Sequence, residues 1–551
     1  MFKILIFFIL ILATASQAKD FKNCESCHNI EPIDSVHKIS CVQCHVPKSL
    51  RGKIDSHSVI IKNPSSFEYV KTQCGRCHER DIENVEQSLH GTLSSCINIT
   101  RFIWHAQNSY KPKYAVHKTK TLKTIPKPKR TIKEPKDLVD DLLRRKCLRC
   151  HLQNNSYPTA GTYRAKGCAA CHMEFSLSGR YEGEDRVMFN KVGYSKTHMF
   201  YKHPKISSCL ACHNNEFVGT DYVGLFPQDY DISFHSPILR NGRFKKRIFG
   251  IGQHHLTADL HFKLGLTCVD CHRKREVMGD GKIYTNELEA VRVRCVSCHG
   301  GYIKKPSTEF VTQKKGEYIF SSVNGEQFKV MLFNKDLVAH KYHKTVSCSA
   351  CHSAWQYGNF QLNLYLDKTK NYKMWKNLIY QEDPYLEGFL KRAKIFPDLK
   401  PLMPDYIDHK LKYGIWYSGW LARRWSYFTL IKGNDGLYYI ARPLFQYRLT
   451  YKNKKGSIVF DDVDNMSAIM PYTPHTTSLF GKTCESCHNN EFLLNADKFS
   501  NTAVDEFFKG KTLFGRRLSK QEKERLQSKK YKKIRFKMLK KFAVKVFKSK
   551  Q

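Results

Sequence analysis

The feature that most constrains this chain is a short motif, Cys-x-x-Cys-His, which occurs ten times between residues 24 and 488. The ten copies contain 20 of the 21 cysteines of the 551-residue chain. This spacing, with histidine directly after the second thiol, is the attachment signature of c-type haem. The two thiols bond to one porphyrin edge, and the histidine then lies under the iron as its first axial ligand. The sequence therefore predicts about ten covalently attached haem c groups.

The predicted attachment residues are ten triplets, in each of which the histidine is the proximal iron ligand. We number them as sites 1 to 10 in chain order: Cys24, Cys27 and His28; Cys41, Cys44 and His45; Cys74, Cys77 and His78; Cys147, Cys150 and His151; Cys168, Cys171 and His172; Cys209, Cys212 and His213; Cys268, Cys271 and His272; Cys295, Cys298 and His299; Cys348, Cys351 and His352; Cys484, Cys487 and His488.

Two other interpretations of Cys-x-x-Cys compete with haem attachment. Paired copies build zinc ribbons, and a single copy is typical of a thioredoxin-like redox pair. Neither requires histidine at the fifth position, and all ten copies have it. We therefore prefer covalent haem, and predict no catalytic side chain for an electron-carrying chain.

The N-terminus has the pattern of a secretory signal peptide. A positive start at Lys3 is followed by an apolar run, Ile4–Ala13, and by a small-residue cleavage site ending at Ala18. Ten apolar residues are too few to span a bilayer. We expect residues 1–18 to be removed and the protein to be exported to the periplasm or the cell surface; the alternative is an uncleaved anchor. Export normally favours disulfides, so the many thiols need another role.

Fifteen histidines lie outside the motifs, more than the ten second axial ligands that ten irons need. Six lie four to nine residues before a cysteine, where a short tether would hold an imidazole near a haem: His37, His90, His203, His261, His343 and His475. Further candidates are His57, His117, His198, His235, His254 and His255, and weaker ones are His105, His340 and His409. Irons with two histidine ligands shuttle electrons and leave no open position for a substrate.

Cys96 is the one cysteine outside a complete motif. Its lead-in resembles the segment before Cys209, but Ile99 and Thr100 stand where the second cysteine and the histidine would be needed. We interpret it as a decayed site without haem; a free buried thiol and a sequence error are the alternatives.

At this point the chain resembles the multihaem c-type cytochromes of bacteria and archaea. The resemblance rests on the motif array and on Cys348–Trp355 and Pro471–His475, and it covers most of residues 24 to 490. It implies short α-helices and long loops wrapped around haems stacked edge to edge, with little regular secondary structure. The family also contains enzymes for nitrite, hydroxylamine and tetrathionate. One nitrite-reducing branch has Cys-x-x-Cys-Lys at its active haem, which this chain lacks.

Motif spacing and composition predict the organisation of the chain. The expected parts are a three-haem module with the decayed site (19–117), a basic Pro-containing linker and short helix (118–146), a six-haem core (147–352), an aromatic, partly β insert (353–483), the last haem segment (484–517) and a basic amphipathic helix (518–551).

Two of these parts have open roles. In the insert, turn signals at Asn434–Gly436 and Lys454–Gly456 separate short strand-like runs, and Asn324–Gly325 predicts a separate hairpin. We prefer a packing insert that shields haems to a docking or substrate lobe. The tail begins with a capping-box pattern, Ser519 and Glu522. Contact with a membrane surface and packing on its own domain are equally open for it.

The formal net charge is +42 before haem, and ten haems remove about 10 to 20 units. The surplus would steer acidic redox partner proteins or anionic lipid, and no motif points to nucleic acid. We expect an exported decahaem electron carrier for respiration or extracellular electron transfer. The alternatives are a multihaem oxidoreductase acting on a small nitrogen or sulfur compound at one open haem, and a subunit of a conductive filament.

Overall fold

The computed structural model describes residues 24–51, 57–155, 158–214, 218–227, 247–355, 362–375, 381, 383–420, 428–444, 447–464, 468–496 and 510–548. The expected signal peptide and His235 lie outside these residues, as does the side chain of His254. Among the described residues, no helix combines the length and apolar character needed to cross a membrane.

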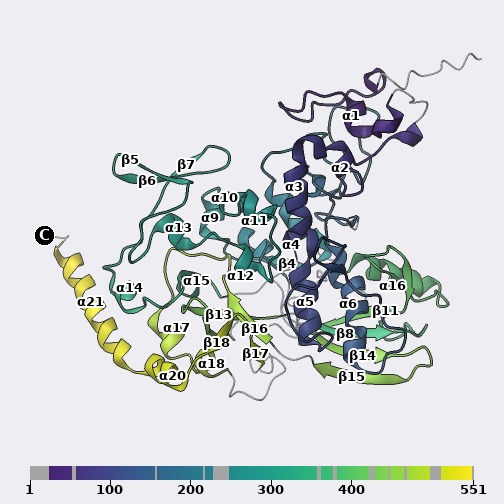
Figure 1. Cartoon of the computed structure of the whole chain (residues 1–551). Coiled ribbons are helices and arrows are strands. Elements are labelled where there is room, and N and C mark those ends of the chain that lie inside the picture. The colour runs from purple at the N-terminus through teal and green to yellow at the C-terminus, as the bar shows by residue number, and fades with distance from the viewer. Residues whose placement is uncertain are drawn as a thin grey trace, which may run out of the picture.

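Short helices and loops run from the N-terminal end through the middle of the molecule, and a β-rich lobe forms its lower part (Figure 1). The helices before residue 150 are α1 (Cys41–His45), α2 (Val70–Gln73), α3 (Gly75–Gln87), α4 (Leu89–Thr92), α5 (Ser94–Ile103) and α6 (Val139–Arg145). The middle helices are α7 (Ala169–His172), α8 (Ile206–Leu210), α9 (Leu260–Lys263), α10 (Cys268–Cys271), α11 (Lys274–Val277), α12 (Glu287–Ala290), α13 (Cys295–His299), α14 (Val338–Tyr342) and α15 (Cys348–Cys351).

Strands outside the lobe are few and short. Two small pairs are β1 (Tyr114–Ala115) with β2 (Lys123–Thr124), and β3 (Leu225–Pro227) with β4 (Gln253–His255). The predicted hairpin forms between β6 (Glu317–Ser321) and β7 (Gln327–Lys329), and β5 (Val311–Lys314) joins its other side. Gly325 has φ 87°, a left-handed conformation that glycine adopts without strain.

The lobe contains two larger sheets. The four-stranded sheet has the order β11 (Ile415–Trp420), β8 (Leu362–Asp367), β14 (Tyr447–Lys452) and β15 (Ile458–Asp464), with β8 and β14 parallel. The five-stranded sheet has the order β17 (Lys511–Thr512), β16 (Ala468–Tyr472), β13 (Tyr438–Pro443), β12 (Leu430–Gly433) and β18 (Gly515–Arg517). A short pair, β9 (Leu402–Pro404) with β10 (Leu411–Tyr413), and α16 (Pro384–Ile395) complete the lobe.

The lobe is larger than the expected insert over 353–483, because its core recruits distant segments. Its buried cluster combines Trp416 and Phe389 with Ile97 of α5 and Leu142 of α6. Residues 511–517 add β17 and β18 to the five-stranded sheet. Residues 118–146 likewise pack on the lobe, since Ile125 belongs to the same cluster. Apolar side chains in a segment that composition marks as a linker therefore place it in the core.

The C-terminal segment forms two helices where we expected one. Helix α20 (Lys520–Gln527) starts with the predicted capping box between Ser519 and Glu522, and α21 (Lys530–Lys548) follows after a break at Ser528. Both follow α17 (Cys484–His488) and α18 (Glu491–Asn495) along the chain, and α17 packs against α20 and α21. In Figure 1 the yellow α21 extends away from the lobe, far from the N-terminal helices.

Candidate haem sites

Nine of the ten motifs coil into a single helical turn. In six of them the backbone N–H of the histidine donates to the backbone carbonyl of the first cysteine. Examples are His28 to Cys24 at 3.0 Å and His352 to Cys348 at 2.7 Å. In α1, α13 and α17 the motif itself is the helix. A turn of this kind brings both thiols and the imidazole together over five residues, as one porphyrin requires.

Site 4 has a different backbone. Cys147–Arg149 forms a 3₁₀ turn that is broken at Leu148, and Cys150 has φ −105° and ψ 66°, outside the helical region. The imidazole of His151 is almost fully buried, and its Nε2 donates to the carbonyl of Tyr406 at 2.9 Å. At this site the nitrogen expected to face iron contacts the β lobe.

All 21 cysteines have free thiols. Among the described residues, no group of three or more Cys, His, Asp or Glu side chains has the arrangement of a metal site. The thiols therefore form neither a disulfide framework nor a preassembled zinc ribbon in the part of the chain that the structure describes. Pairs of free thiols beside an imidazole match the donor set of covalent haem.

Eight motif histidines face a second histidine at nearly the same spacing. The ring centroids are 5.9 to 6.3 Å apart in the following pairs: His28 with His57, His78 with His37, His45 with His198, His213 with His90, His272 with His475, His299 with His261, His352 with His340, and His488 with His343.

This spacing fits an iron between the two rings. A histidine nitrogen binds a transition metal at about 2 Å, and the ring centre lies roughly 1 Å behind that nitrogen, so two imidazoles on one metal have centres about 6 Å apart. Direct contact between stacked rings would be closer, as in the pair Trp375 and Tyr417 at 4.0 Å. The residues present at these eight sites thus fit a haem with two histidine ligands.

Hydrogen bonds at Nδ1 orient the rings so that Nε2 remains available. Among the motif histidines, Nδ1 lies 2.8 Å from Asp185 in His28, 2.8 Å from the Ile61 carbonyl in His45 and 2.7 Å from the Met331 carbonyl in His299. The facing histidines show the same arrangement: Nδ1 of His37 lies 2.6 Å from Asp34, and Nδ1 of His343 lies 2.6 Å from the Ala339 carbonyl. Partners of this kind fix the tautomer of metal-binding histidines.

Burial keeps several of these rings neutral. It lowers the pKa of His213 to about 4, with His90 nearby lowering it further, and it lowers the pKa of His475 to about 4. Burial also lowers the pKa of His90 and His198. A neutral imidazole has a free lone pair for iron, so the local environment favours the form that binds metal.

The structure brings most of the candidate second ligands to a site. Seven of them, His37, His57, His90, His198, His261, His343 and His475, face a motif histidine. His340, which we ranked as weaker, faces His352 and was underrated. It precedes His343 by three residues in the sequence around α14, and the two rings point to sites 9 and 10. The three-residue spacing between His340 and His343 was the sequence signal that could have identified His340 as a candidate ligand.

Two motif histidines differ. The ring of His172 lies parallel to that of Phe200, with centroids 6.0 Å apart, and His203 is a further neighbour. His151 has Arg164, His409 and His117 as neighbours. Among the described residues, neither faces a second imidazole at the spacing of the other eight.

Cys96 lies in α5, a continuous ten-residue helix. Its side chain is half-buried and packs on the lobe cluster, and Ile99 and Thr100 are buried in the same helix. His90, which precedes Cys96, instead faces His213 of site 6. The second cysteine and the histidine of a motif are thus replaced by core residues.

Comparison with known proteins agrees with this geometry. The chain is 27% identical over 171 residues to Cytochrome c-552 of Haemophilus influenzae strain Rd, and 26% identical over 171 residues to Cytochrome c-552 of strain 86-028NP. This likeness supports a c-type cytochrome. The match covers 30% of this chain and 27% of each relative. No family model matches the chain, and no solved structure matches it.

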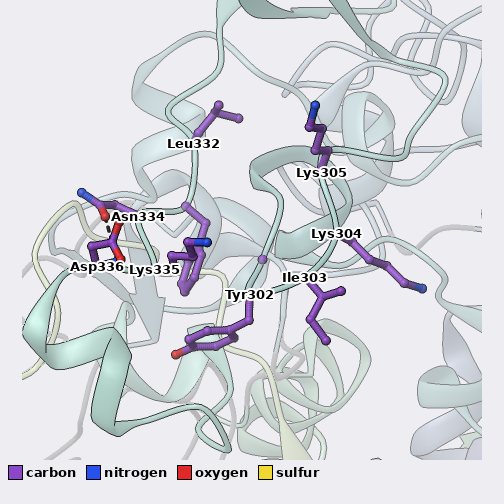
Figure 2. Close-up of a pocket in the computed structure, with 10 residues that line it drawn as sticks. Tyr302, Ile303, Lys304, Lys305, Leu332, Asn334, Lys335 and Asp336 are labelled. Atoms are coloured by element: carbon purple, nitrogen blue, oxygen red, sulfur yellow. Dashed lines mark hydrogen bonds between the residues drawn. The ribbon is translucent and has the colours of Figure 1, made fainter.

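A basic pocket lies beside sites 8 and 9 of this cytochrome-like chain. It is lined by Lys304, Lys305 and Lys335, with Asp336 as the one acidic residue in its wall (Figure 2). Tyr302, also in the wall, donates to the carbonyl of His340 through its hydroxyl at 2.6 Å. The wall of the pocket thus contains three lysines and also Tyr302, which holds the backbone of a candidate iron ligand.

Proposed function

We propose that this protein is an exported decahaem c-type cytochrome that carries single electrons through a chain of haems with two histidine ligands each, in respiration or extracellular electron transfer. The observation that supports it most directly is the set of eight imidazole pairs at 5.9 to 6.3 Å, each containing a motif histidine. Such irons exchange electrons without binding a substrate. The likeness to Cytochrome c-552 over part of the chain agrees with a c-type cytochrome.

When bound, the haems supply the electron transfer, and the residues of this chain hold and tune them. The thiol pairs attach the porphyrin, and Nδ1 contacts such as His28 with Asp185 increase the basicity of the ligand. Buried surroundings exclude water and lower the local dielectric, which influences the reduction potential of each iron.

The test is purification after expression with a cytochrome c maturation system. We expect red protein with a mass increase of ten haem groups, iron that remains after acid–acetone extraction, and low-spin spectra at the eight paired sites. Colourless protein, disulfides, or zinc in place of iron would contradict the proposal. Cell fractionation of the native protein tests export separately, and cytoplasmic protein would contradict that part.

A multihaem oxidoreductase is the second candidate, because His151 and His172 lack a facing imidazole at the common spacing. Carbon monoxide added to the ferrous protein tests it: binding at one haem supports the enzyme, whereas ten inert irons contradict it. We also propose that the partners are acidic redox proteins, since Lys304, Lys305 and Lys335 gather beside sites 8 and 9. A conductive filament would be seen by electron microscopy of the pure protein.

A further inference from the structure

We propose that site 4 is a side branch of the haem chain, joined to it at site 6 beside Arg164, and that His117 supplies the second ligand of its iron. The proposal rests on the proposed function, since it concerns the spatial order of the same ten haems. It assigns a ligand and a route that the motif order along the sequence does not contain.

Thiols of different sites lie close enough to interact, and each such pair indicates two neighbouring haem positions. Hydrogen-bonded pairs are Cys41 with Cys24, Cys209 with Cys268, and Cys295 with Cys348. Pairs that interact electrostatically are Cys74 with Cys44, Cys168 with Cys74, Cys209 with Cys171, Cys271 with Cys298, and Cys351 with Cys484. The resulting order is 1, 2, 3, 5, 6, 7, 8, 9 and 10, a line that omits site 4.

Backbone and helix contacts support the same order. Helix α1 of site 2 packs against α2, which ends directly before Cys74 of site 3, and α7 of site 5 packs against α8 of site 6. The Lys482 N–H, just before site 10, donates to the Cys351 carbonyl of site 9 at 2.8 Å.

Site 4 meets this line through the contact of Cys150 with Cys212 of site 6. The β lobe contacts the residues around its motif. Lys146 pairs with Asp383 at 3.2 Å, and Arg144 pairs with Asp405 at 2.7 Å. A haem at site 4 would therefore have a neighbour at site 6 and protein of the lobe beside it, which is the position of a branch.

Arg164 lies where the branch meets the line. Its guanidinium is a charged neighbour of Cys150, Cys171 and Cys212, which belong to sites 4, 5 and 6. The residue is 6% exposed, and its N–H groups donate to the carbonyls of Asn154 at 2.6 Å and Arg149 at 3.2 Å. No carboxylate among the described residues pairs with it. A buried cation without a counter-charge is costly, and its position beside three motifs marks the point where sites 4, 5 and 6 meet.

His117 is the candidate that fits the iron of site 4. Both ring nitrogens are buried and make no hydrogen bond of good geometry, although the Glu86 backbone lies near the ring. Iron ligation would satisfy one of these two nitrogens. His117 is also a neighbour of His151, close enough to interact with it electrostatically. For His151 to bind iron, its Nε2 has to give up the hydrogen bond to the Tyr406 carbonyl.

The branch is tested by deleting one haem at a time. A photosensitiser is attached covalently to the N-terminal end of the protein, and a nitroxide is attached to the C-terminal end. The arrival of an electron at the nitroxide is measured as the loss of its signal. The double variant Cys147→Ala/Cys150→Ala should contain nine haems, lack the branch and still transfer electrons from end to end. The matched control Cys209→Ala/Cys212→Ala also has nine haems but should lose end-to-end transfer. Loss of transfer in the first, or its retention in the second, would overturn the branch.

A second variant that removes a haem from the line, Cys268→Ala/Cys271→Ala at site 7, is measured in case the site 6 variant fails to fold. It too should lose transfer, and unchanged transfer would overturn the order. Wild-type protein without ten haems would instead reject the proposed function, so the two failures can be told apart.

The ligand is tested spectroscopically in the full protein. His117→Ala should convert one haem in ten from low spin to high spin and let that haem bind carbon monoxide, and added imidazole should restore the low-spin signal. His409→Ala, which removes an exposed histidine near the same ring, should leave all spectra unchanged. An unchanged spectrum in His117→Ala, or one haem that already binds carbon monoxide in the wild type, would overturn the assignment.

Discussion

The β lobe and the haem-binding segments form their cores differently. In the lobe, Trp416, Tyr417 and Phe389 are almost fully buried and belong to one cluster of apolar side chains. In the described part of residues 24–91, by contrast, the buried hydrophobic residues are only Val46, Ile61, Val70 and Ile82. We expect the lobe, with its apolar cluster, to fold without haem, and we expect the haem segments to take much of their core from the porphyrins.

Withholding haem is the strongest test of this difference between the lobe and the haem-binding segments. Protein made in a cytoplasm without the maturation system should retain the lobe and lose the structure of residues 24–91 and 260–355. Hydrogen exchange with mass spectrometry should show rapid exchange in these two segments and protection in β8, β11 and β14. Equal protection in both regions would mean that the haem segments fold on their own side chains.

A cavity in the lobe should affect stability without affecting haem. Trp416→Ala removes a fully buried indole whose Nε1 donates to Asp141 at 2.8 Å, and such truncations cost about 3–5 kcal/mol. We expect that loss in denaturant unfolding followed by far-UV circular dichroism. The haem count and the absorption spectrum should equal those of the wild type; a lost haem would show that the lobe and the haem chain fold as one unit.

Removing a facing histidine should have the opposite effect. His475→Ala leaves the iron at His272 without its second imidazole, so one haem in ten should become high spin and bind carbon monoxide. The unfolding free energy of the lobe should change little, since His475 lies outside its clusters. The control His255→Ala, an exposed histidine at the end of β4, should keep all irons unchanged. Carbon monoxide binding in both variants would contradict the pairing.

The smallest effect is expected at Cys96, which packs on the lobe core. Cys96→Ser should leave ten haems by intact-mass measurement and destabilise the protein by about 1 kcal/mol. A variant with nine haems would show that Cys96 takes part in attachment after all.

The ten motifs are local signals, which is why they could be located from sequence. Two thiols and an imidazole within five residues need only one helical turn to form a haem site, and nine motifs adopt it. The hairpin at Asn324–Gly325 and the capping box at Ser519 are local in the same sense, and both form as predicted.

The second ligands depend on contacts across the fold. His198 faces His45 from more than 150 positions away, and His90 faces His213 although it precedes the incomplete motif at Cys96. No spacing rule connects such residues. His340 faces His352 through the fold in the same way, and strands and helices from distant segments complete the core of the lobe.

Sequence alone determined the kind of chemistry, because attachment depends on residues adjacent along the chain. Tertiary structure decided which imidazoles face one another and which thiols of different sites lie close together. These are distances through space, and they arise only when packing brings separate segments together.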